Sequence, residues 1–465
     1  ALHYIVSQQY KNMNPDLPSL QPWVLATRPP AKRFIFKRNP FFHKLDLKGR
    51  QLPYIDKIKM HITSSKLIPL KTGSGETDLQ SRGLNFTNYT LLKKSEKKFG
   101  YITRLWRTAK GARWAIYPNL NARDREWRKI FRDVRFRRAL SLGINRYEIN
   151  QVFYYGLSRE TNNSLLRESP LFNEKYSSRW IKFDLVSANK LLDELGLEKR
   201  NDDGIRLLPS GKPMEITIVF STEENEPADI LELVSDTWKK IGIKLLSKPL
   251  NREVMRNRVF SGNAIMSMWS GLENGIANAE ASPKELAPTS QQQLQWPMWG
   301  QYIETSGKAG EPADMDVPKN LFTLSLLWQT AATTELKRQI WRQMLDLYTN
   351  NVFSIGIISS VPQVVVVNSS LINIPKEELH EKIDQRVEKM FAEGVVKEIA
   401  SFFKMKVYIE LSANKIIGIR EIKDYLSKKI TLSETKKLIS QRTKQYAKRQ
   451  FTWSRGHMKS WDKIY

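Results

Sequence analysis

The chain has 465 residues, of which 41% are hydrophobic and 26% charged, so it is long enough for two to four globular domains with ordinary cores. It contains no cysteine, which excludes disulfides, thiolate catalysis and cysteine-ligated metals. The formal net charge is +27, but as far as about residue 370 the bases are dispersed among acids, which favours solvated faces over a nucleic-acid surface.

Several classes of protein are excluded or disfavoured by what the sequence lacks. No run of about 18 apolar residues occurs, so we expect no transmembrane segment. The opening residues Ala1 to Tyr4 form neither a basic n-region nor an apolar h-region, so we expect no signal peptide within this sequence. The five histidines have no metal-ligand spacing, and no nucleophile elbow is present. The sequence therefore predicts no catalytic residue, no metal site and no cofactor.

The first half of the chain contains short strand signals and then a helix. Apolar residues at 34–36 predict a short strand, and Ile55, Ile58, Met60 and Ile62 predict another strand or a strand pair. Asp133 is a suitable N-cap, and apolar residues follow it at helical spacing as far as Gly143. A second helix is predicted to end at Gly156.

Between residues 188 and 250 helix and strand patterns alternate. The spacing predicts a helix over 188–195, a strand over 214–220, a helix over 230–241 and a strand over 243–246. Alternation at this period is typical of an α/β lobe with helices covering a sheet.

Several motifs resemble the family 5 solute-binding proteins, which serve ABC importers of oligopeptides, nickel and related ligands. The run Arg38-Asn39-Pro40-Phe41-Phe42, followed by Gln51-Leu52-Pro53-Tyr54-Ile55-Asp56, is similar to an early signature of that family. The segments 75–80, 134–141, 188–193 and 296–300 match later family motifs in the same order. The resemblance covers about residues 1–370.

The resemblance implies a two-lobed receptor of the periplasmic-binding-protein type (type II-like), which closes on a peptide-like solute and delivers it to an ABC permease. We expect residues 1–128 to form a partial first lobe and residues 129–370 a nearly complete second lobe. The family's opening segment and its closing strand and helix are expected to be missing. Since closure needs both walls, we expect no tight peptide binding.

Candidate ligand residues lie where the second lobe would face the solute. Pockets of this kind are mostly apolar with a few polar anchors. The candidates for the wall are Trp269, Asn274, Trp296 and Trp299. An equally simple alternative is that these tryptophans pack in the core, because large aromatic side chains are commonly buried.

Beyond Leu371 the sequence changes character. Pro375 is a suitable first helical residue, apolar residues from Leu379 to Phe391 form one face, and Gly394 ends it. Thr431 and Glu434 form a capping box before a further helix. We expect residues 371–465 to be all-helical and separate from the α/β part, with few contacts to it.

This C-terminal part resembles the tRNA dimethylallyltransferases. The segments 378–394 and 417–426 are similar to that family, and Thr443-Lys444-Gln445-Tyr446-Ala447-Lys448-Arg449-Gln450 with Trp453 matches its near-terminal motif. The resemblance implies weak tRNA contact through Lys444, Lys448, Arg449 and Arg455. No Gly-x-x-x-x-Gly-Lys-[Ser/Thr] loop is present, so the diphosphate-binding part of the enzyme is absent.

Three functions remain open. The chain is a solute-binding component of an importer, which implies a periplasmic location. Alternatively it is a tRNA dimethylallyltransferase by its C-terminus alone, which implies the cytoplasm. The third alternative is an inactive gene fusion or assembly chimera, because the join near residue 371 has no Pro, Gly or Ser linker. We favour solute binding as the family and the chimera as the state of this molecule.

Overall fold

The structure is a computed structural model that describes residues 15–16, 19–374, 387–388, 390–404 and 417–442. The chain divides into two compact units, one of residues 64–371 and one of residues 1–63 and 372–465. The pocket described below lies within residues 64–371.

A six-stranded sheet forms the centre of the larger unit, in the order β7-β11-β6-β10-β8-β9. The β10-β8 and β8-β9 pairs are parallel and the other pairs are antiparallel. Its strands are β6 (Trp114–Pro118), β7 (Arg159–Glu160), β8 (Glu215–Ser221), β9 (Lys244–Leu250), β10 (Met266–Trp269) and β11 (Ile355–Ser359).

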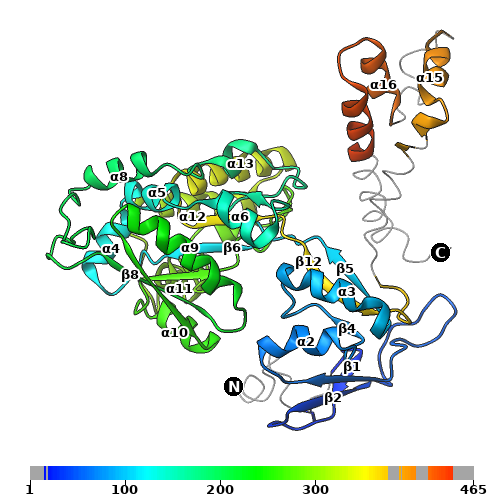
Figure 1. Ribbon diagram of the computed structural model, residues 1–465, viewed down its shortest axis with the longest axis horizontal. Helices are drawn as coiled ribbons and strands as arrows, with labels where there is room; N and C mark the ends of the chain where they lie inside the picture. Colours follow the sequence, from blue (N-terminus) through cyan, green and yellow to red (C-terminus); the bar gives the residue numbers. More distant parts are fainter. Residues whose placement is uncertain (1–14, 17–18, 375–386, 389, 405–416, 443–465) are drawn as a thin grey trace. The chain divides into compact units, whose positions relative to one another are not determined.

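Helices cover both faces of this sheet (Figure 1). They are α4 (Arg125–Arg132), α5 (Val134–Leu142), α6 (Arg146–Tyr154), α7 (Glu174–Ser178), α8 (Leu185–Asp193), α9 (Glu226–Lys240), α10 (Arg252–Phe260), α11 (Pro297–Glu304), α12 (Asp316–Thr330) and α13 (Thr334–Asn350). Successive side chains of β6 point to opposite faces of the sheet. Ile116 belongs to the main core, whereas Ala115 and Tyr117 pack in a second cluster with Met255 and Val259 of α10.

A smaller sheet, in the order β4-β12-β5, completes the unit. Its strands are β4 (Leu79–Gln80), β5 (Tyr101–Trp106) and β12 (Gln363–Asn368), with α2 (Ile68–Gly73) and α3 (Tyr89–Phe99) beside them. The chain therefore crosses between the two sheets twice, from β5 to β6 and from β11 to β12. The lobe limits expected at 1–128 and 129–370 do not follow the sheets, because β6 joins the larger sheet and β12 returns to the smaller one.

The remaining described segments belong to the other unit. Near the N-terminus β1 (Trp23–Leu25), β2 (Arg33–Arg38) and β3 (Lys57–His61) form an antiparallel sheet. In the C-terminal part the described residues are helical, with α15 (Val395–Lys404), α16 (Ile419–Leu426) and a helix over 432–442. Val387, Val395, Ile399, Ile422 and Ile439 form their core.

The helix caps and the buried helix face that were predicted from the sequence are found at the expected residues. The Asp133 side chain accepts a hydrogen bond from the Arg135 backbone N–H and caps α5. Thr431 and Glu434 exchange hydrogen bonds in a capping box. The expected helix face of 230–241 is the buried face of α9. Among the residues that the structure describes, no helix is long and apolar enough to cross a membrane.

Candidate ligand-binding site

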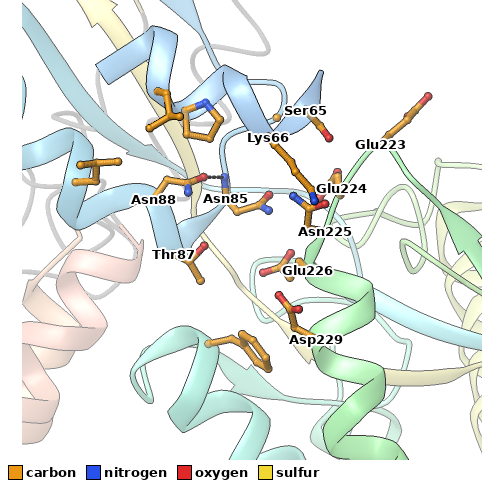
Figure 2. Close-up of a pocket in the computed structure, with 15 residues that line it drawn as sticks. Ser65, Lys66, Asn85, Thr87, Asn88, Glu223, Glu224, Asn225, Glu226 and Asp229 are labelled. Carbon is orange, nitrogen blue, oxygen red and sulfur yellow. Dashed lines mark hydrogen bonds between the residues drawn. The ribbon is translucent and has the colours of Figure 1, made fainter. Parts of the chain in front are cut away.

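A cavity of about 390 Å³ lies where the N-terminus of α9 faces α2 and α3 (Figure 2). We call it the acid-lined pocket. Its walls are formed by Ser65, Lys66, Pro69, Leu70, Gly83, Asn85, Thr87, Asn88, Leu91, Phe153, Glu223, Glu224, Asn225, Glu226 and Asp229. Figure 2 shows Glu223 and Glu224 on the segment that leads into α9 and Glu226 and Asp229 on its first turn, opposite Lys66 and Asn85. The pocket thus has one cationic and four acidic side chains.

The segment just before α9 concentrates these acids for a local reason. Glu226 and Asp229 occupy the first turn of α9, where carboxylates are favoured by the backbone N–H groups and the helix dipole. Glu223 and Glu224 precede them in the connection from β8. The chain therefore presents several negative charges at one helix start, and each needs a partner if it is buried.

Glu226 is 4% exposed and is held by three donors. Trp114 Nε1 donates to its carboxylate at 2.8 Å, Tyr154 Oη at 2.9 Å and Arg113 Nε at 3.2 Å. Burial raises the pKa of Tyr154 well above its usual value, and the neighbouring Glu226 charge raises it further. Glu226 is therefore a satisfied structural carboxylate that fixes the floor of the pocket.

Arg113 also pairs with Glu224, and its Nη2 lies 3.3 Å from the Asn85 side-chain oxygen. Burial works against the charge of Arg113, but the two glutamates hold its pKa above the usual value. Burial raises the pKa of Glu224, and the positive charge of Arg113 partly offsets that rise. This arginine links the smaller sheet's connection to α9, so both sides of the pocket share one ion-pair network.

Asp229 differs from the other acids of the pocket in its lack of a partner within the described part of the chain. It is exposed and has no ion pair among the described residues. Burial of its carboxylate raises its pKa, and repulsion from Glu232 and Glu226 adds to the rise. Glu223, by contrast, pairs with Arg82 at 3.1 Å and Arg252 at 3.6 Å. A cationic group in the pocket would find Asp229 as its available partner.

The four predicted ligand residues lie in two places. Trp296 and Trp299 are 0% and 1% exposed, and the Trp296 ring packs against Tyr348 and Phe353 at centroid distances of 6.0 and 4.9 Å. These two tryptophans belong to the core, as the packing alternative anticipated. None of the four predicted residues lines the acid-lined pocket.

Trp269 and Asn274 lie at and just after the end of β10, in a second polar region. Lys110 Nζ lies 2.7 Å from Glu273 Oε1 and 3.1 Å from Ser270 Oγ. The Glu273 backbone N–H donates to both oxygens of Glu285, at 2.9 and 3.1 Å. Burial raises the pKa of Glu285 to about 7. Asn274 is exposed beside this group, so it remains a candidate contact for a solute.

The sequence reasoning missed the acid-lined pocket. The signal was present as Glu223-Glu224-Asn225-Glu226 directly before an apolar helical pattern. Such a run is usual at a helix N-terminus, so it does not by itself indicate a binding site. The predicted tRNA contacts Lys444, Lys448, Arg449 and Arg455 lie outside the described residues. Within the described part of the chain no cluster of side chains could hold a metal ion.

Two family models match the chain. Bacterial extracellular solute-binding proteins, family 5 Middle, match residues 4–289, and IPP transferase matches residues 342–457. The second match begins inside α13, although α13, β11 and β12 pack within the larger unit.

Individual relatives agree with this division. The periplasmic alpha-galactoside-binding protein of Rhizobium meliloti is 21% identical over 391 residues, covering 79% of this chain and 54% of that protein. The tRNA dimethylallyltransferase of Pelagibacter ubique is 46% identical over 93 residues, covering 20% of this chain and 30% of that enzyme. The chain thus spans about half of the first relative and less than a third of the second.

Solved structures share the fold of the larger part. The oligopeptide-binding protein OppA is 30% identical with a TM-score of 0.52, over 80% of this chain and 61% of that chain. The periplasmic binding protein MelB of Agrobacterium fabrum, solved with stachyose, is 19% identical with a TM-score of 0.63, over 76% of this chain and 53% of that one. Because the first family model covers more than half of the sequence, the chain belongs to the family 5 bacterial extracellular solute-binding proteins, fused to a segment that matches the IPP transferases.

Proposed function

We propose that residues 64–371 derive from the solute-binding component of an ABC importer and take a peptide-type solute in the acid-lined pocket. The observation that carries the proposal is that Asp229 and Lys66 line the pocket with opposite charges and that neither has an ion pair within the described residues. A short peptide carries an ammonium and a carboxylate, and each would meet an opposite charge there. The permease of such an importer is the proposed partner.

Binding by this chain should be weak. The chain spans 54% of the alpha-galactoside-binding relative, and we propose that its pocket does not close on both sides of a solute. A pocket that does not close leaves the ligand partly solvated and its ion pairs screened. We therefore expect a dissociation constant on the order of 1 mM or weaker for a tripeptide.

Calorimetry of the full chain with trialanine tests the affinity, and two-dimensional NMR tests the place. In calorimetry we expect no saturable heat up to about 0.1 mM trialanine. In NMR we expect the chemical shifts of residues around α9 to change at about 10 mM trialanine, and to stay unchanged with N-acetylated trialanine, which lacks the ammonium group. Asp229→Asn should abolish the shifts, whereas Asp236→Asn on the same helix should not. Micromolar affinity would overturn the weak-binding proposal, and shifts that persist with the acetylated peptide would overturn the pocket.

A second candidate function rests on the C-terminal part. We propose that it binds tRNA weakly through Lys444, Lys448, Arg449 and Arg455 and does not transfer a prenyl group. Four phosphate contacts would release about four counterions, so the logarithm of the binding constant should fall with the logarithm of salt at a slope of about −3 to −4. Base-specific recognition by these residues should be absent, because the given sequence contains no Gly-x-x-x-x-Gly-Lys-[Ser/Thr] loop of the catalytic part that would receive a flipped adenine.

A gel-shift series with tRNA at rising salt measures this slope. Replacing Lys444, Lys448, Arg449 and Arg455 together with glutamine should remove the gel shift of the tRNA at every salt concentration. A radiolabelled dimethylallyl diphosphate assay run in parallel should leave the tRNA unlabelled. An affinity for tRNA that does not change with salt concentration would contradict the phosphate contacts. Radiolabel on the tRNA would reveal a diphosphate site that the sequence does not show.

The two parts imply different compartments. The family of the larger part is extracellular by its description, which supports a periplasmic location, whereas tRNA is modified in the cytoplasm. A chain in one compartment cannot both serve an importer in the periplasm and modify tRNA in the cytoplasm. This supports the proposal that the molecule is a fusion or assembly chimera rather than a two-function protein, and long-read sequencing across the codons for residues 360–380 tests it.

A further inference from the structure

The N-terminal antiparallel sheet of β1, β2 and β3 has two unlike faces. Successive side chains of a strand point to opposite sides, so the strand register shows which residues share a face. Half-buried Phe34, Phe36 and Ile58 lie on one face with the buried Leu25. The opposite face carries the residues that alternate with them, namely Val24, Arg33, Ile35, Lys37, Lys57, Lys59 and His61. We call it the basic sheet face.

The four lysine and arginine side chains of the basic sheet face are left without a balancing acid in the described part of the chain. All four are exposed, and none forms an ion pair with a residue that the structure describes. Residues 23–62 contain ten Lys and Arg but two acids. Both acids are used elsewhere, since Asp46 pairs with Arg50 at 2.8 Å and Asp56 with Arg38 at 3.8 Å. The face therefore carries an uncompensated positive charge.

The strand register makes this charge unfavourable for the isolated sheet. Lys37 lies directly opposite Lys57, and like charges in that arrangement destabilise a strand pair. Residues two apart on a strand are separated by about 7 Å and neighbouring strands by about 5 Å, so the four cations lie within one flat patch. A negatively charged partner over this patch would remove the repulsion.

The other side chains of the sheet indicate the class of that partner. Sites for single-stranded nucleic acid combine cations with aromatic rings on which bases stack. Here Phe34 and Phe36 point to the opposite face, and the apolar residues among the cations are the aliphatic Val24 and Ile35. Flat patches of cations with long aliphatic stems suit a lipid surface, because the stems can lie along the apolar region while the charges stay at the headgroups.

The connection between β2 and β3, residues 39–56, supplies exposed apolar side chains. Phe41, Leu45 and Leu47 are 85%, 62% and 53% exposed, and the exposed Lys44 and Lys48 lie among them. Large apolar groups are unfavourable in water, whereas apolar side chains interspersed with lysines are typical of segments that lie in the interface of an anionic bilayer. The backbone of a nucleic acid offers no apolar region for these three side chains, so the connection favours lipid over RNA.

We propose that the basic sheet face and residues 39–56 dock on an anionic lipid bilayer. The four cations lie at the headgroup phosphates, and Phe41, Leu45 and Leu47 enter the boundary with the acyl chains. Each Lys or Arg near such a surface raises the partition coefficient about fivefold. This surface shares no residue with the acid-lined pocket or with the four residues proposed to contact tRNA, so it can fail while those proposals stand.

Co-sedimentation of the full chain with lipid vesicles tests the proposal. The vesicles contain equal parts of phosphatidylglycerol and phosphatidylcholine, and pure phosphatidylcholine vesicles are the neutral reference. At about 0.1 M salt we expect a partition coefficient at least about a hundredfold higher on the anionic vesicles. At about 1 M salt most of this difference should disappear, because the screening length falls from about 10 Å to about 3 Å.

Lys57→Gln combined with Lys59→Gln identifies the surface. This double variant should weaken binding to anionic vesicles about 25-fold, and it should fold normally because it relieves the repulsion from Lys37. Far-UV circular dichroism checks the folding. Lys239→Gln combined with Lys240→Gln removes the same charge from exposed positions at the end of α9, and it should change binding less than about threefold.

Two further measurements separate lipid from other partners. Phe41→Ser should weaken vesicle binding about fivefold without changing its salt dependence, because it removes an apolar group and no charge. The affinity for tRNA should be the same with and without the Lys57 and Lys59 substitutions. Equal losses for the two lysine pairs, or equal partitioning onto neutral and anionic vesicles, would overturn the lipid surface. A loss of tRNA affinity as large as the loss of vesicle binding would mean that the basic sheet face binds nucleic acid instead.

Discussion

Replacing Arg146 with alanine is expected to lower the free energy of unfolding of residues 64–371 by about 4 kcal/mol. Arg146 is 1% exposed and donates to Gly356 O at 2.9 Å, Ser141 O at 2.8 Å, Ile181 O at 3.2 Å and Ser141 Oγ at 2.8 Å. Each acceptor left without a donor in the core costs about 1 kcal/mol. The loss should be measured by chemical denaturation followed by tryptophan fluorescence.

Two further variants separate the causes. Burial lowers the pKa of Arg146 to about 9, so its charge is itself costly and the hydrogen bonds must offset that cost. Arg146→Met restores apolar volume but leaves the same acceptors unpaired, so it should still lose about 3 kcal/mol. Arg125→Ala, an exposed arginine of α4, should stay within about 0.5 kcal/mol of the parent. A loss below about 1 kcal/mol for Arg146→Ala would mean that these bonds contribute little net stability.

Replacing Glu226 with alanine is expected to destabilise the same unit by about 3 kcal/mol. The change leaves the Trp114 N–H and the Tyr154 hydroxyl without their partner. Arg113 keeps Glu224, which limits the penalty of an unpaired buried charge. Breaking one partner of a buried ion pair costs more than the pair contributes, since the remaining charge stays desolvated. Chemical denaturation measures the loss.

The companion experiment is the double variant Arg113→Met with Glu226→Leu. The Arg113 and Glu226 charges leave together, and Glu224, the other partner of Arg113, has a side chain that is 30% exposed and can be solvated, so the double variant should recover about half of the stability that Glu226→Ala loses. Glu223→Ala is the control, since its side chain is 41% exposed and its removal should cost less than about 1 kcal/mol. If the double variant were as unstable as the single one, shape rather than charge would explain the role of Glu226.

How far the sequence predicts this structure depends on whether the signal is local. The buried face of α9 and the Asp133 cap depend on residues within one or two turns, and both were predicted correctly. The fold class of the larger part followed from the alternation of helix and strand and from the order of family motifs, and structural relatives confirm it.

Features that depend on distant residues were not predicted. The place of β12 between β4 and β5 depends on pairs such as Val366 with Gln80, and a valine run does not specify its partner. The acid-lined pocket requires α9 to face α2 and α3, which no local pattern encodes. The burial of Trp296 and Trp299 could not be distinguished from a ligand wall, because an apolar aromatic suits either environment.

The position of β12 in the smaller sheet has a consequence for synthesis of the chain. Asn368 donates its side-chain amide to Asp78 at 3.0 Å across 290 positions of sequence, and β12 supplies the strand between β4 and β5. Early strands of the smaller sheet therefore leave the ribosome long before their central neighbour exists. Their open edges need shielding during that interval, and loop closure over so long a separation makes the last pairing slow. Because Asn368 must clear the ribosome before it can pair, part of the C-terminal segment is already being translated when the smaller sheet can first close.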